Sequence, residues 1–119
     1  MLDRLSPEEQ HALLELLIYL AKSDGKVQDV EEDILHQYAD LVDVDFDSLD
    51  GTLTPQDLVP QFENAVSRTV VLQELLRLSH LDGYFAEDEK AVILDIAEQM
   101  RLPREFVAEI DNWVVDDLR

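Results

Sequence analysis

Apolar residues recur at helical spacing in several segments of the chain, and none alternates apolar and polar residues as a half-buried strand would. The pattern predicts a helix from residue 7 to the corner at residue 25, a second from about 28 or 29 to 42, and a short one from 55. Further helices are expected over about 61–81, with a break near Ser67, over 87–100, and from 103 onward. The chain should therefore be all-α.

Local signals set several helix boundaries. Ser6 is suited to cap the first helix, Pro7 to open it, and Glu9 to complete a capping box with Ser6. Gly25 and Gly83 each follow an aspartate, and glycine adopts the left-handed conformation that commonly ends a helix. We therefore expect both glycines to form corners between helices.

The periodicity also predicts which side chains turn inward. The expected buried faces are Leu13, Leu14, Leu17, Ile18 and Ala21 in the first helix, Val30, Ile34, Leu35, Tyr38 and Leu41 in the second, and Phe106, Val107, Ile110, Trp113 and Val114 in the last. The aromatic residues Tyr19, Tyr84 and Trp113 are expected mostly in the core. Any of them that is exposed would mark a partner site.

The chain contains an internal repeat. Residues 13–39 align with residues 71–97, with identical residues at Leu14, Leu17, Leu20, Asp24, Gly25, Glu31 and Ala39 of the first copy. Each copy is a helix, a corner and a second helix, and each needs the other to cover its apolar side. We predict a single-domain helical bundle over residues 1–119, with pseudo-repeated units at about 7–44 and 61–102 and a final helix at about 103–118.

Charge narrows the classes of partner. The chain has 28 acidic and 9 basic residues, for a net charge of −19. Nucleic acid is a poor partner for such a surface, whereas basic protein surfaces and divalent cations are better ones. The apolar run at residues 12–21 is about half the ~20 residues needed to span a bilayer, so we expect no direct membrane insertion. The absence of cysteine is in keeping with a reducing cytoplasm.

The two repeated corners share the pattern Asp-Gly-x-apolar-x-x-x-Glu, which places Asp24 with Glu31 and Asp82 with Glu89. This is the second half of an EF-hand loop, but its first ligand positions are leucines here, so calcium binding of the EF type is not expected. One reading is purely structural, with the aspartate accepting backbone N–H groups and the glutamate placed in the first turn of a helix. The other is a shared cation, because an aspartate at a helix C-terminus opposes the helix dipole and this occurs twice. Both readings stay open.

A third Asp-Gly pair lies in the acidic connection at residues 42–58, where Thr54 and Pro55 signal a new helix start with Asp57 at its third position. Its spacing does not fit a regular calcium loop, so a solvated connection is expected, and a weak divalent site remains open. Asp33 and His36 loosely resemble half of a di-iron motif, but the second repeat has alanine and leucine there. Neither a hydrolytic triad nor a glycine-rich phosphate loop is present in the sequence.

The segments "LLELLIYLAKSDGKVQDVEE" and "LLRLSHLDGYFAEDEKAVILDIAEQMRLP" resemble the TerB-like family, which comprises bacterial tellurite-resistance proteins and the N-terminal domain of a membrane-anchored J-domain cochaperone. The resemblance spans about residues 8–113 and maps the family's repeated corner onto Asp24, Gly25, Glu31, Asp82, Gly83 and Glu89, with Val27 and Phe85 as the apolar positions. Two departures are Gln28 and Ala86, which replace the family's usual serine. The resemblance implies an all-α, intracellular bacterial protein without established catalysis, with roles in stress or metal-oxyanion resistance and with metal binding suspected at the acidic corners.

Two main functional hypotheses follow. The first is an acidic module that binds a protein partner with a basic surface, acts in the cytoplasm and is not an enzyme. A homodimer is a further expectation. The second is a sensor that gathers Asp24, Glu31, Asp82 and Glu89 around a divalent cation, which could be Ca²⁺, Mg²⁺, Mn²⁺ or Zn²⁺. No other cofactor is expected, and a metal-dependent hydrolase has the least support.

Overall fold

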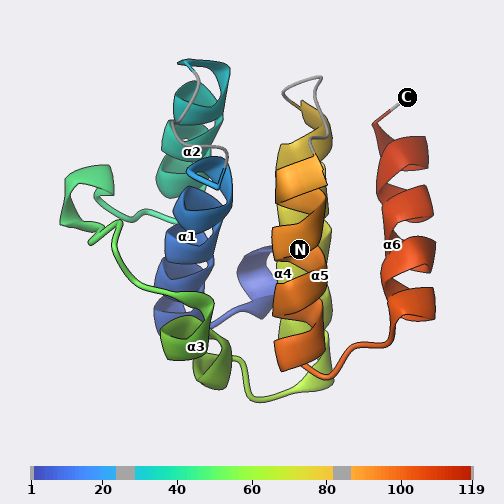
Figure 1. Ribbon diagram of the computed structural model, residues 1–119. Helices are drawn as coiled ribbons and strands as arrows, with labels where there is room; N and C mark the ends of the chain where they lie inside the picture. The colour runs from blue at the N-terminus through green and yellow to red at the C-terminus, as the bar shows by residue number, and fades with distance from the viewer. Residues whose placement is uncertain (1, 24–28, 82–86, 119) are drawn as a thin grey trace.

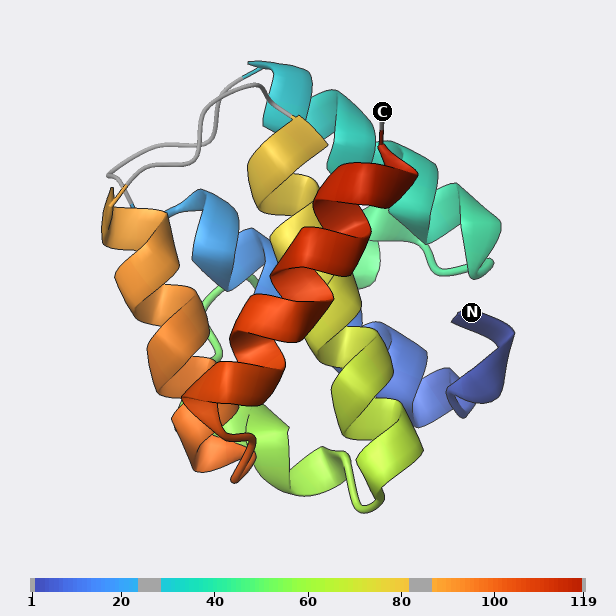
Figure 2. The ribbon, with the colours of Figure 1, turned by 90° about the vertical axis from the view of Figure 1, so that its right-hand side faces the viewer.

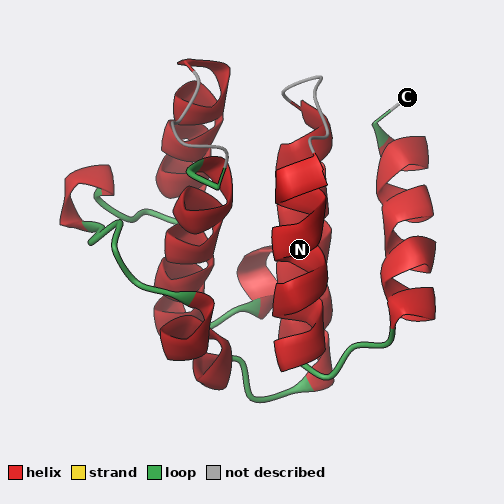
Figure 3. Ribbon diagram, viewed as in Figure 1, coloured by secondary structure: helices red, strands yellow, loops and turns green. Residues whose placement is uncertain are grey.

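The computed structural model describes residues 2–23, 29–81 and 87–118, and these residues form helices and loops without a strand (Figure 3). The α-helices are α1 (Pro7–Ala21), α2 (Asp29–Leu41), α3 (Pro55–Leu58), α4 (Ala65–Leu81), α5 (Glu87–Gln99) and α6 (Arg104–Asp117). The described residues also form three short 3₁₀ helices: η1 (Leu2–Arg4) before α1, η2 (Phe46–Ser48) between α2 and α3, and η3 (Val59–Gln61) directly after α3. The prediction of an all-α fold is confirmed.

The start of α1 follows directly from its sequence. The Ser6 Oγ accepts the Glu9 backbone N–H at 3.1 Å, and the Glu9 carboxylate accepts the Ser6 backbone N–H at 3.0 Å. Pro7 occupies the first helical position, where no N–H partner is required. The predicted capping box therefore fixes where the first core helix begins.

The core lies around α1 and α4, which pack against each other (Figure 1). Helix α1 also contacts α2, α3 and α5, while α4 contacts α5 and α6 across its other side (Figure 2). Both central helices are therefore apolar over most of their circumference rather than along one stripe. The largest fully buried side chains are Leu13, Leu14, Leu16, Leu17, Leu20, Leu35, Leu58, Phe62, Leu72, Leu75, Leu76 and Leu78.

Helix α6 is joined to α4 by two polar pairs near its C-terminal half. The Arg77 Nη1 donates to the Asp117 Oδ2 at 2.9 Å, and the His80 Nε2 lies 2.7 Å from the Asp111 Oδ1. These contacts add to the apolar packing of α6, which buries Val107 and Val114. None of the described helices is both long and apolar enough to span a membrane.

The helix predicted over 61–81 is shorter and more regular than expected. It begins at Ala65. The Asn64 Oδ1 accepts the Ser67 backbone N–H at 2.8 Å, so Asn64 is the N-cap of this helix. The predicted break near Ser67 is wrong, because the helix continues through this residue and Ser67 is buried.

Three residues expected in the core are exposed. Leu41 is 74% exposed at the end of α2, Trp113 is 45% exposed on α6, and Tyr19 is 36% exposed on α1. On α2 and α6 the other predicted inward positions that the structure describes are buried or partly buried, and Leu35 and Val114 are almost fully covered. The predicted buried faces of α2 and α6 therefore point toward the core, but they include residues at the edge of the face that are exposed. Both are outer helices, and other helices cover each of them on one side only.

Candidate functional site

The glutamates of the two repeated corners occupy equivalent and buried positions. Glu31 is the third residue of α2 and Glu89 is the third residue of α5, and their side chains are 0% and 1% exposed. The first turns of both helices lie at the same end of the bundle, together with the last turns of α1 and α4 (Figures 1 and 2). Both carboxylates therefore sit in the first turn, where the helix dipole favours negative charge.

Glu89 has a contact within the bundle. The Ser79 hydroxyl lies 3.3 Å from the Glu89 Oε2 and 3.2 Å from the Leu75 carbonyl oxygen, so it donates to one or shares its proton between them. Ser79 is itself fully buried near the end of α4. The first turn of α5 is thus tied to α4 by a side-chain contact.

The remaining residues of the predicted cation site, Asp24 and Asp82, lie outside the described residues. Within residues 2–23, 29–81 and 87–118, no group of three or more histidines and carboxylates could hold a metal ion. The described structure therefore supplies one buried carboxylate per corner. Carboxylate oxygens suit hard divalent cations, so Glu31 and Glu89 fit such a site chemically, while the full ligand set stays a prediction.

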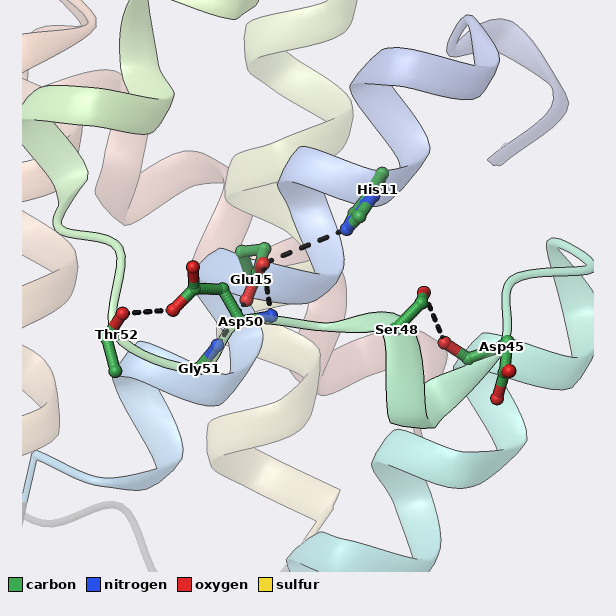
Figure 4. A network of polar contacts seen from close by, with 7 residues as sticks. All are labelled: His11, Glu15, Asp45, Ser48, Asp50, Gly51 and Thr52. Carbon is green, nitrogen blue, oxygen red and sulfur yellow. Dashed lines mark hydrogen bonds and ion pairs between the residues drawn. The ribbon is translucent and has the colours of Figure 1, made fainter.

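The third Asp-Gly pair is docked on α1 by a buried carboxylate (Figure 4). Glu15 is 3% exposed, and its two oxygens accept the backbone N–H groups of Asp50 at 2.8 Å and Gly51 at 2.9 Å. The Lys22 Nζ donates to the Gly51 carbonyl oxygen at 3.1 Å. Gly51 has a φ of +76°, a conformation that glycine adopts without strain. This corner is a structural clamp between α1 and the connection that follows α2.

The residues around this clamp are also locally bonded. The Ser48 hydroxyl donates to the Asp45 carbonyl oxygen at 2.6 Å, and the Thr52 hydroxyl donates to the Asp50 carboxylate. The His11 Nε2 lies 3.8 Å from the Glu15 Oε2 (Figure 4). The aspartate side chains of the connection, including Asp50, are exposed as expected, but the backbone of Asp50 and Gly51 is held by α1. The sequence signal was Glu15 itself, a lone charge inside the most apolar run.

A second buried polar network joins three helices. The Tyr38 hydroxyl of α2 donates to the Glu74 carboxylate of α4, and Glu74 is 5% exposed. The Arg77 Nε lies 3.6 Å from the same carboxylate, and its Nη1 bonds to Asp117 of α6. Burial and the charge of Glu74 raise the pKa of Tyr38. Burial opposes the charge on Arg77, but the hydrogen bond to Asp117 and the charge of Glu74 outweigh it and raise the pKa of Arg77.

A groove of about 610 Å³ lies between η1, α2 and α4, and Tyr38, Glu74 and Arg77 of this network are part of its lining. Its apolar lining includes Leu2, Ile34, Leu41 and Leu81, and its polar floor includes Tyr38 and Glu74. Sequence reasoning missed this groove, since Leu41 was assigned to the core. The exposure of Leu41 and of Leu81, which is 42% exposed, could not be read from helical periodicity.

Comparison with known proteins supports one family. The family model described as "Tellurite resistance protein TerB" matches residues 1–51. The matched range includes α1, α2, the first repeated corner and the Asp50–Gly51 clamp, whereas the second repeated corner lies beyond it. The matched range is less than half of the chain, and the matched family is the one that the sequence resembles. No curated protein and no solved structure matches the chain.

Proposed function

We propose that this protein is an acidic, TerB-like helical module that acts by binding a protein partner with a basic surface, in the cytoplasm of a bacterium and in a process of stress, metal or tellurite resistance. The observation that carries the proposal is the distribution of charge. Against a net charge of −19, most acidic side chains that the structure describes are exposed, including Asp33, Asp40, Glu105 and Glu109. Such a surface speeds encounter with a basic partner and disfavours an acidic one.

Binding rather than catalysis is proposed because the strongest polar groups are used within the fold. Glu15 accepts two backbone N–H groups, and Glu74 is engaged by Tyr38 and Arg77. A catalytic carboxylate would need to reach a substrate, and these two are nearly fully buried. The exposed carboxylates are suited to surface recognition.

Affinity capture from a cell lysate at rising NaCl concentration tests this function. The bait is the wild-type protein, and two variants of equal net charge serve as comparisons, Asp33→Asn/Asp40→Asn and Glu105→Gln/Glu109→Gln. We expect a partner with a basic surface that stays bound at physiological salt and is released at higher salt. One variant should lose this partner much more than the other. Capture that both variants weaken equally would indicate non-specific charge attraction and would oppose the proposal.

A divalent-cation sensor is the second candidate. It is favoured by the complete burial of Glu31 and Glu89 at equivalent first-turn positions, because buried charges in proteins are paired or coordinate metals. In this hypothesis Asp24 and Asp82 supply further oxygens, and Ca²⁺, Mg²⁺, Mn²⁺ or Zn²⁺ would neutralise the charge that the corners concentrate at one end of the bundle. The cation would then control the stability of that end.

A further inference from the structure

The groove between η1, α2 and α4 has the shape and chemistry of a docking site for a helix. Helices α2 and α4 form two of its sides, and η1 closes a third. Ile34, Tyr38 and Leu41 line it at the i, i+4 and i+7 positions of α2, so one face of this helix is turned toward the groove. Two of its leucines, Leu41 and Leu81, are 74% and 42% exposed.

Polar contacts between side chains of α2, α4 and α6 hold the floor of the groove in place. The Tyr38 hydroxyl crosses from α2 to the Glu74 carboxylate of α4, and Arg77 bonds to both Glu74 and Asp117. Arg77 is the basic residue in the lining, and its guanidinium is engaged by these two carboxylates. Its charge is therefore compensated and does not attract an acidic ligand.

The border of the groove is acidic. Gln37 lines the groove, and Asp33 and Asp40 lie four residues before and three residues after it on α2, so they are its neighbours on the helix surface. Both aspartates are exposed. A ligand whose apolar side chains enter the groove therefore lies next to these carboxylates. This favours a ligand with lysine or arginine beside its apolar side chains.

We propose that this groove binds an amphipathic helix of a partner protein, with leucine-like side chains at i, i+3 or i+4 and i+7 and with lysine or arginine on its flanks. The apolar anchors cover Leu41 and Leu81, and the basic flanks face Asp33 and Asp40. This is the helix-in-groove mode, in which a few apolar anchors give affinity and the charged border selects the partner. The inference rests on the proposed function and adds to it the place and the form of the partner.

The test uses a designed peptide of about 18 residues, long enough to form helix, with leucines at the anchor positions and lysines elsewhere. Binding to the full chain is measured by fluorescence anisotropy, and the contact surface is mapped by the shifts of backbone amide NMR signals. We expect saturable binding, with shifts on α2, α4 and η1. A peptide of the same composition whose leucines do not share a face should bind much more weakly.

The decisive variants are Leu41→Asp and a matched control, Val66→Asp. Both side chains are exposed, and Val66 lies near the opposite end of α4 from Leu81, so neither change should unfold the bundle. We expect Leu41→Asp to weaken peptide binding about tenfold or more and Val66→Asp to leave it nearly unchanged. Thermal unfolding of both variants verifies that each is folded.

Other results would overturn the inference in distinguishable ways. If both variants bind the peptide equally, or if the NMR shifts map to another face, the groove is not the binding site. The proposal of an acidic binding module would still stand. Failure of the peptide to bind, together with failure to capture any basic partner, would remove both proposals. If the wild type sediments as a dimer and Leu41→Asp as a monomer, the occupant is a second copy of the chain and the partner helix is excluded.

Discussion

The Glu15 carboxylate of α1 accepts the backbone N–H of Gly51 at 2.9 Å, across 36 positions of the chain. This contact closes the connection after α2 onto the first helix and aligns Asp50 for the second hydrogen bond. The N–H groups of Asp50 and Gly51 thus donate to a buried carboxylate rather than to backbone carbonyl oxygens. The acidity of the chain thus serves its fold at this point as well as its surface.

Substitutions at this clamp should be costly. Glu15→Ala leaves the N–H groups of Asp50 and Gly51 without their acceptor, and each unsatisfied buried group costs about 1–3 kcal/mol. Glu15→Gln keeps one acceptor and should lose less. Urea unfolding measures both changes, and a Glu15→Ala variant as stable as the wild type would show that the clamp does not hold the connection.

Gly51→Ala tests the same corner from its backbone. Its φ of +76° is unfavourable for alanine, and an added Cβ would lie 3.2 Å from the Lys22 Nζ. We expect a loss of about 1–2 kcal/mol in the free energy of unfolding, because the left-handed region costs that much for a residue with a side chain. Lys22→Met removes the nearby amine. If the loss persists in Lys22→Met/Gly51→Ala, it comes from the backbone rather than from the side-chain contact.

Ser79→Ala tests the hydrogen bond to the buried Glu89. We expect a loss of about 1–2 kcal/mol, since hydrogen bonds to charged groups are stronger than neutral ones. Thr69→Ala is the matched control, because the Thr69 hydroxyl also donates to the carbonyl oxygen four residues earlier, at 2.8 Å, but in an exposed position. Equal losses in chemical unfolding of the two variants would argue against a special role for the Glu89 contact.

The Tyr38 hydroxyl should make stability depend on pH in the alkaline range. Below the unfolded-state pKa of about 10, tyrosine is protonated in both states and its contribution is complete. Above that pH the unfolded chain releases the proton while the folded protein, whose Tyr38 pKa is raised, retains it, so stability falls as pH rises. In Tyr38→Phe, the free energy of unfolding should not show this part of its decrease with rising pH. The difference between the wild-type and variant unfolding free energies across pH 9–11 measures it, and a constant difference would contradict the assignment.

The cation hypothesis makes a prediction about heat stability. Divalent ions at millimolar concentration are compared with NaCl of equal ionic strength, for the wild type, Asp24→Asn/Asp82→Asn and the equally charged control Asp33→Asn/Asp40→Asn. A saturable site at 100 times its dissociation constant adds about 2.7 kcal/mol of stability. The sensor hypothesis expects one ion to stabilise the wild type and the control but not the corner variant. If every ion acts as salt does, the corners are structural.

Local sequence signals predicted much of the fold. Ser6, Pro7 and Glu9 located the start of α1 because a capping box involves only residues in one turn. Thr54 and Asp57 did the same for α3, where the Asp57 carboxylate accepts the Thr54 N–H at 3.1 Å. The boundaries of α2 and α5 were likewise placed within about one residue, within the usual uncertainty of helix ends.

Long-range features could not be predicted in the same way. Periodicity shows which face of a helix is apolar, but not whether another element covers all of it, so Leu41 and Trp113 were wrongly placed in the core. The Glu15 clamp joins distant parts of the chain, so a lone charge in an apolar run indicates a buried polar contact but does not identify its partner. Of the predicted cation ligands, the burial of Glu31 and Glu89 is compatible with the hypothesis, while Asp24 and Asp82 lie outside the described residues.

The proposed function requires that the acidic surface recognise one basic partner at a defined place. Zero-length carbodiimide cross-linking measures this, because the reagent joins carboxylates to lysine amines only where the two groups are in contact. With the captured partner, we predict cross-links from Asp33 and Asp40 of α2 to neighbouring lysines, retained at physiological salt and lost when unlabelled wild-type protein competes. Cross-links scattered over all acidic helices, or abolished by modest salt, would show that the attraction is general and that the protein has no such site.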